Sequence, residues 1–223
     1  MDKTCYMCHS IATSKEHVPP KCIFPKQKGM LGEINLRKKL ITVPSCDAHN
    51  GKKSKDDEYL MFILSSGYRG NRHKEELFKK VMRAHKRRPH VYQSFIKDPK
   101  ELTLKNSLDK EIETGSFRVD RKRFDRIFHQ IACGLFFDCY DKKWLGTTNV
   151  FTSLLVNLDS PNSPEVNRRI ASVAKQTQKA FSRTMSIGDN DKIFTYRILD
   201  GGNHKYGMHL TFYQGIEITI LLG

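Results

Sequence analysis

Two short stretches, Cys5-Tyr-Met-Cys8 and Cys46-Asp-Ala-His49, decide how the beginning of the chain folds. In each stretch, two residues with metal-binding side chains are separated by two others. This spacing lets both side chains bind one tetrahedral zinc ion through a tight turn. Together the pairs offer three thiolates and one imidazole, which is a ligand set of closed structural zinc sites. We therefore expect a structural zinc ion on Cys5, Cys8, Cys46 and His49.

Spacing alone leaves the fourth ligand open, because Cys22 or His9 could replace His49. The competing explanation is a set of unrelated buried thiols, since free cysteine is often buried. Disulfides are disfavoured, because the chain is neither short nor of secreted type. Cys133 and Cys139 lie far from the two pairs and are expected to be buried thiols.

The charge of the chain indicates an acidic partner. Lysine and arginine number 39 against 24 acidic residues, which gives a formal net charge of +15 and a sequence pI of about 9.6. Nucleic acid is the usual partner of so basic a surface. The sequence has no apolar run long enough to span a membrane and no apolar stretch of signal-peptide type near Met1. We expect a cytoplasmic protein that binds nucleic acid and does not enter a membrane.

Acidic, histidine and asparagine residues that could take part in catalysis lie close in sequence to these cysteine pairs. Glu16-His17-Val-Pro-Pro20 follows the first pair, and Asn50 directly follows His49. This order resembles that of the HNH (His-Me finger, ββα-metal) endonucleases, in which an acid-histidine pair lies between two zinc-binding pairs. The residues 40–46 and 55–59 also resemble bacterial members with the Glu-His-Val-Pro-Pro motif. The resemblance covers roughly a quarter of the chain.

Two residues depart from the usual family pattern. Glu16 stands where aspartate is more usual, and His49 stands where cysteine is more usual. Both replacements can supply the same coordination chemistry. His49 could alternatively be the final histidine of the motif, although its spacing from Cys46 mirrors the spacing of Cys5 and Cys8.

The resemblance implies a two-stranded ribbon and a helix around one catalytic divalent ion. In this chain His17 would be the general base, since its ordinary pKa near neutrality suits that task. Glu16 and Asn50 would be oxygen ligands of Mg²⁺ or Mn²⁺, and Asn35 is a possible match to the middle asparagine of the family. The implied function is metal-dependent cleavage of DNA, with a role in bacterial phage defence or in mobile elements.

Positive side chains near these residues are candidate phosphate contacts. Lys52, Lys53 and Lys55 follow Asn50 closely. A second group lies on one face of a helix expected over residues 71–87, and this face could equally be merely solvated. That group consists of Lys79, Arg83, Lys86 and Arg87.

Apolar spacing and capping residues outline the remaining elements. Helices are expected to begin at Ser54, Asn71, Arg121 and Ser163. Strands are expected over residues 150–158, 193–199, 208–212 and 216–222, the last three as an antiparallel meander joined by glycine-containing turns. Residues 98–116 are polar and give no clear assignment.

The predicted class is therefore α+β, with a zinc-stapled ββα-metal module followed by helices and a C-terminal α+β region. We divide the chain into a nuclease module over residues 1–66, a basic helical segment over 67–98 and a C-terminal domain over 99–223. The rival function is a zinc module that binds nucleic acid without cutting it, or that docks on a partner. The C-terminal domain could bind another protein or a second copy. The pair Glu16-His17 discriminates between the two functions, because a pure binding module does not need it.

Overall fold

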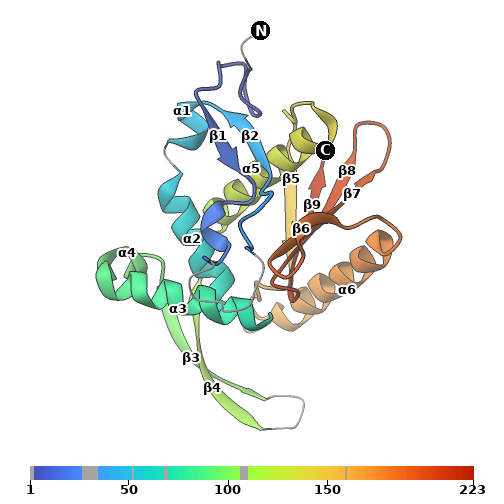
Figure 1. The fold of residues 1–223 in the computed structure, drawn as a ribbon. Coiled ribbons are helices and arrows are strands. Elements are labelled where there is room, and N and C mark those ends of the chain that lie inside the picture. Colours follow the sequence, from blue (N-terminus) through green and yellow to red (C-terminus); the bar gives the residue numbers. More distant parts are fainter. Residues whose placement is uncertain (1–2, 27–34, 52, 68–69, 106–109, 159) are drawn as a thin grey trace.

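The computed structural model describes residues 3–26, 35–51, 53–67, 70–105, 110–158 and 160–223. It has a small N-terminal module, a long central helix and a C-terminal antiparallel sheet (Figure 1). This architecture confirms the predicted α+β class and the C-terminal meander. No helix within the described ranges is both long and apolar enough to cross a membrane.

The N-terminal module consists of a hairpin and the helices that follow it. Strand β1 (Ser14–His17) pairs antiparallel with β2 (Thr42–Ser45). The short helix η1 (Lys21–Ile23) lies between these strands in sequence, and α1 (Asp47–Asn50) and α2 (Ser54–Ser66) follow β2. The hairpin and the helices are therefore arranged in the order strand, strand, helix.

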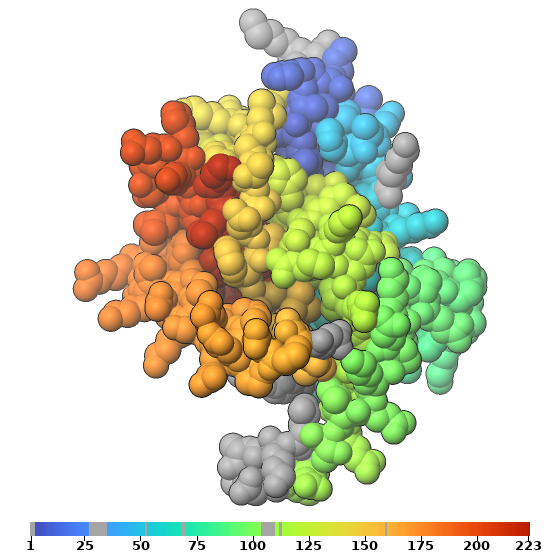
Figure 2. Space-filling view, turned by 180° about the vertical axis from the view of Figure 1, so that it is seen from behind, coloured from blue at the N-terminus to red at the C-terminus, as the bar shows by residue number. Residues whose placement is uncertain are grey.

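Helix α3 (Arg72–Arg87) follows α2, and the side chain of Asn71 caps it by accepting the backbone N–H of His73. Helix α4 (Pro89–Gln93) begins at a proline, whose missing N–H is no loss in a first turn. Strands β3 (Lys97–Lys105) and β4 (Glu111–Arg118) then form a two-stranded ribbon. The ribbon protrudes from the body in the front and rear views (Figures 1 and 2).

The central helix is α5 (Arg121–Tyr140). The carboxylate of Asp120 caps its start by accepting the backbone N–H of Arg123, and the left-handed Asp141 ends it. The helix contacts α2 and β2 of the N-terminal module as well as the C-terminal sheet. Its buried side chains include Phe124, Ile127, Phe128, Ile131 and Leu135. Helix α5 therefore packs against both the N-terminal module and the C-terminal sheet.

The C-terminal sheet has the strand order β5-β9-β8-β7-β6. The strands are β5 (Thr148–Thr152), β6 (Ile187–Asn190), β7 (Phe194–Asp200), β8 (Tyr206–Phe212) and β9 (Ile216–Leu222). Phe212 of β8 contacts Phe128 of α5, whereas His209 of β8 stacks on Phe181 of α6 (Ser163–Phe181). Because residues of opposite parity point to opposite faces of a strand, α5 and α6 cover opposite faces of the sheet.

One strand prediction differs from the structure, and one stretch that had no assignment forms strands. The strand expected over residues 150–158 ends at Thr152, whose hydroxyl donates to the Glu217 carbonyl and accepts the Leu154 backbone N–H. This hydroxyl turns the chain away from the sheet. The polar stretch from residue 98 instead forms the ribbon of β3 and β4. The division into three segments remains a prediction, and buried residues of all three join one continuous hydrophobic cluster.

Gly134 brings α5 into close contact with the end of the hairpin. A Cβ atom on Gly134 would lie 2.6 Å from Cγ2 of Val18, the residue after His17. Real Cβ atoms do not come this close to another carbon, so the absence of a side chain permits the packing.

We expect Gly134→Ala to destabilise the protein by up to about 2 kcal/mol in urea unfolding. Overpacking costs roughly 1–3 kcal/mol, which outweighs the gain of about 1 kcal/mol in helix propensity. In a Val18→Ala background the clash with the two methyl groups is gone, and the same substitution should no longer destabilise. Stabilisation by Gly134→Ala in both backgrounds would contradict this packing.

Candidate active site and metal centre

The structure brings Cys5, Cys8, Cys46 and His49 together, with their ligand atoms all within 4.8 Å of one another. Sγ of Cys8 lies 3.8 Å from Sγ of Cys46, and Nδ1 of His49 lies 3.3 Å from Sγ of Cys46 and 3.5 Å from Sγ of Cys5. Two sulfur ligands of a tetrahedral zinc ion are separated by about 3.8 Å, because each Zn–S bond measures about 2.3 Å. The group could therefore hold one zinc ion.

Local backbone structure places these four ligands. Cys46 is the residue between β2 and α1, and His49 lies one turn further on, with its N–H donating to the Cys46 carbonyl. The loop of Cys5 and Cys8 is held to β2 by the hydrogen bond from Tyr6 N–H to the Pro44 carbonyl. The ligands thus tie the N-terminal loop to the start of the helices.

The alternative fourth ligands lie outside the group. His9 is exposed, and the Cys22 thiol points to the backbone carbonyl of Asp57. Burial raises the pKa of Cys22 to about 12, so this thiol stays protonated. In contrast, hydrogen bonds from Ser10 lower the pKa of Cys8 to about 6, which favours the thiolate that a metal requires.

A pocket of about 130 Å³ is lined in part by Asn50, the residue that follows the ligand His49. Glu16 and His17 reach it from the end of β1, Asn50 from α1 and Asp57 from α2. Asn50, Lys53 and Asp57 share one face of the helical stretch, because their spacing of three and four residues matches the helical repeat. The hairpin and the helical face therefore meet at this pocket. The remaining lining residues are Lys15, Pro20, Lys21, Cys22 and Lys53.

Glu16 is buried, with only 4% of its surface exposed. Its Oε1 forms an ion pair with Nζ of Lys53, which is also buried. Its Oε2 accepts hydrogen bonds from the hydroxyls of Tyr6 at 3.2 Å and Ser45 at 3.3 Å. Lys53 was predicted as a phosphate contact and is instead the internal counter-ion of Glu16.

His17 is half-buried at the mouth of the pocket. Burial, followed by the nearby charges of Lys21 and Arg37, lowers its pKa below the ordinary value of 6.5. The imidazole is therefore neutral at neutral pH and able to accept a proton. Asn50 is fixed nearby, because its Nδ2 donates to Oγ of Ser14 at 2.8 Å.

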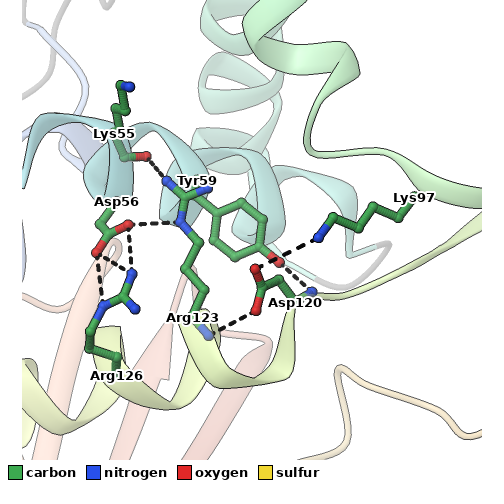
Figure 3. A network of polar contacts seen from close by, with 7 residues as sticks. All are labelled: Lys55, Asp56, Tyr59, Lys97, Asp120, Arg123 and Arg126. Carbon is green, nitrogen blue, oxygen red and sulfur yellow. Dashed lines mark hydrogen bonds and ion pairs between the residues drawn. The ribbon is translucent and has the colours of Figure 1, made fainter.

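Three consecutive acids of α2 have three different surroundings. Asp56 accepts from Arg123 at 2.7 Å and from Arg126 at 3.1 Å on α5 (Figure 3). Glu58 pairs with Arg88 near α4 at 2.5 Å. Asp57 alone of the three lines the pocket, and burial raises its pKa to about 6.

The network around Asp56 anchors α2 to α5. Arg123 donates to the backbone carbonyl of Lys55 at 2.6 Å and lies over the ring of Tyr59, 4.4 Å from its centroid (Figure 3). The Tyr59 hydroxyl accepts the backbone N–H of Asp120, the cap of α5. These contacts hold the helical face of the pocket in place.

The other predicted site residues that the structure describes do not line the pocket. Asn35 is absent from the pocket lining and accepts the backbone N–H of Arg37 in a turn. Lys55 is exposed on the first turn of α2. Lys52 lies outside the described residues. The predicted basic face of α3 is exposed at Lys79, Arg83, Lys86 and Arg87.

Sequence reasoning missed the positive residues that surround His17 and the acid inside the pocket. Arg37 is held by donating both Nε and Nη2 to the Phe24 carbonyl, at 3.0 Å and 2.8 Å. Lys80 of α3 donates to the carbonyl of Cys22, so α3 packs beside the pocket wall. For Asp57 a signal existed in the sequence, because it stands seven residues after Asn50 on the same helical face.

Removal of the metal cluster should unfold the N-terminal module. We expect Cys46→Ser to lose its zinc ion and to lower the melting temperature by about 10 °C, because a closed zinc site contributes several kcal/mol to folding and 1 kcal/mol corresponds to roughly 2–4 °C at this chain length. Metal analysis and thermal unfolding measure both effects. Cys139→Ser, which removes a thiol outside the cluster, is the control and should keep zinc. Equal zinc content in the two variants would refute the assignment.

The carboxyl of the half-buried Asp57, whose Oδ1 is shielded from solvent, predicts a dependence of stability on pH. Its pKa is raised from 3.8 in the unfolded chain to about 6 in the fold, so the folded state binds the proton more tightly between these values. This contribution to stability is complete below pH 4 and is lost as the pH rises through 6. Asp57→Asn should therefore match the wild type near pH 4 and exceed its free energy of unfolding by about 2 kcal/mol above pH 7.

Denaturant unfolding of both proteins from pH 4 to pH 8, with the zinc content of the two kept equal at each pH, measures this difference. Glu58→Gln is the matched control, because Glu58 faces Arg88 rather than the pocket, and it should show no such gain. An Asp57→Asn protein that is less stable than the wild type at every pH would contradict the buried placement.

Comparisons of this chain with protein-family models, with curated proteins and with solved structures found no match. Its function is therefore argued from the side chains of the pocket and from the resemblance of its motifs.

Proposed function

We propose that the protein is a metal-dependent endonuclease of the HNH type that hydrolyses phosphodiester bonds in DNA. The observation that carries the proposal is the meeting of Glu16, His17 and Asn50 at one pocket, with Asn50 next in sequence to His49 of the Cys/His group. They lie on the first strand and the helix of a module in the order strand, strand, helix, which is the order that the family resemblance implies. A module that only binds nucleic acid has no need of this pocket.

His17 has the properties of a general base. Its pKa is lowered by burial, so the ring is neutral and ready to take a proton from water at neutral pH. Lys21 and Arg37 lower the same pKa and add positive charge next to the ring. A phosphate group in the pocket would meet these charges while His17 removes the proton of the attacking water.

The oxygen donors of the pocket fit a hard divalent cation. A carboxylate offers about four lone-pair positions, and those of Glu16 accept from Lys53, Tyr6 and Ser45, so one remains for an ion. Asn50 donates through Nδ2, which leaves its carbonyl oxygen as a ligand. Mg²⁺ or Mn²⁺ bound here would stabilise charge on the phosphate and on the leaving oxygen.

The surface around the pocket suits a nucleic-acid backbone. Lys15 and Lys21 line the pocket itself. Helix α3, which packs beside the pocket through Lys80, exposes the basic residues Arg83 and Lys86. Such a surface supplies affinity that is independent of sequence and weakens steeply with salt.

A second candidate function is binding of nucleic acid without catalysis, through the same zinc group and basic surface. One observation favours it: Glu16 already has Lys53 as its counter-ion within the protein. Under this alternative, loss of the His17 ring changes neither DNA affinity nor any activity.

The test is plasmid cleavage by the zinc-loaded protein with Mg²⁺ and with Mn²⁺. We expect the wild type to cut and His17→Ala to be slower by about a hundredfold or more, the range for loss of a general base. His90→Ala removes an exposed histidine of α4 and should cut at the wild-type rate. Metal analysis must show equal zinc in all three proteins.

Either of two results would contradict the proposal. One is a wild-type protein that leaves plasmid and single-stranded DNA intact with both ions. The other is a zinc-loaded His17→Ala protein that cuts as fast as the wild type.

A further inference from the structure

Asp57 has an oxygen that nothing in the described part of the chain satisfies. Its Oδ1 is shielded from solvent and accepts no hydrogen bond from any described residue. A buried carboxylate oxygen without a donor costs free energy, so such an atom in a pocket points to a ligand. Glu16, the other acid of the pocket, has donors on both of its oxygens.

The residues closest to Asp57 do not supply the missing partner. Cys22 lines the same pocket, but its thiol is directed to the backbone carbonyl of Asp57. Lys53 lies one helical turn before Asp57, and its ammonium forms the ion pair with Glu16. That ammonium therefore gives no hydrogen bond to Oδ1 of Asp57.

The pocket therefore combines a carboxylate oxygen that has no hydrogen-bond donor among the described residues with oxygen ligands from other elements. Asp57 approaches from α2, Asn50 from α1 and Glu16 from β1. Two carboxylates and an amide oxygen from three elements are typical ligands of a hard divalent cation, which also keeps several water molecules. The volume of about 130 Å³ leaves room for an ion with such waters.

We propose that Asp57 is a direct ligand of the divalent ion in this pocket, together with Glu16. This inference rests on the proposed function for the presence of such an ion, and it adds a ligand that the motif resemblance does not supply. Asp57 binds the ion through the oxygen that lacks a partner in the protein. Lys53 remains the counter-ion that keeps Glu16 buried when the ion is absent.

The test measures Mn²⁺ binding to the zinc-loaded full-length protein without DNA, by titration calorimetry and by the electron paramagnetic resonance signal of free Mn²⁺. We expect Asp57→Asn to weaken Mn²⁺ binding about tenfold or more, because carboxylate charge sets the affinity of such sites. Glu58→Gln, the neighbouring acid paired with Arg88, should bind Mn²⁺ like the wild type. Asp57→Asn disrupts no hydrogen bond of Oδ1 and should fold and keep zinc.

Undiminished binding of Mn²⁺ to Asp57→Asn would overturn the inference, and so would the absence of any Mn²⁺ binding to the wild type. The plasmid assay decides the proposed function separately. If the wild type cuts DNA and Asp57→Asn binds Mn²⁺ normally, the nuclease proposal holds and Asp57 is not a ligand. If the wild type binds Mn²⁺ through Asp57 but cuts no DNA, the metal site is confirmed and the nuclease proposal is wrong.

Discussion

The convergence of three thiols and one imidazole within 4.8 Å is the constraint on which the candidate site depends. Cys46 joins the end of β2 to the start of α1, so a metal ion held there fixes the angle between hairpin and helix. Asn50 follows His49 directly, and Glu16 and His17 lie on the strand paired with β2. A zinc ion in this group would therefore position the pocket without taking part in its chemistry. Gly134 and the anchoring of Asp56 by α5 hold the same module from the other side.

The pocket holds charged groups at a cost in stability. Glu16 and Lys53 are both buried, and burial of an ion pair seldom stabilises a fold by itself, because removing both charges from water is costly. Asp57 adds a carboxyl whose pKa is raised to about 6 and an oxygen without a partner. A structural role would favour apolar residues at these positions. Buried charges and shifted pKa values of this kind are typical of sites that bind a ligand.

Sequence reasoning succeeded where local chemistry determines structure. The spacing of the cysteine pairs identified the four clustered residues, and the helices expected to begin at Ser54, Asn71, Arg121 and Ser163 begin within one residue of those positions. It failed where contacts between residues far apart in the sequence determine the structure. The ribbon of β3 and β4 lies outside the core and so carries no strong apolar alternation. Lys53 looks like any exposed lysine in the sequence, and only the approach of β1 turns it into the partner of Glu16. Asp56, Asp57 and Glu58 are chemically similar neighbours, and their separate roles follow from the elements packed around α2.

The central claim is that one zinc ion of the Cys/His group supports a separate pocket for a divalent ion. Anomalous X-ray diffraction tests it directly, on crystals of the zinc-loaded protein soaked in Mn²⁺ and measured at the zinc and manganese absorption edges. The account predicts a zinc peak among Cys5, Cys8, Cys46 and His49, and a manganese peak within bonding distance of Glu16 and Asp57. A zinc peak in place, with no manganese in the pocket and Lys53 still paired with Glu16, would contradict it.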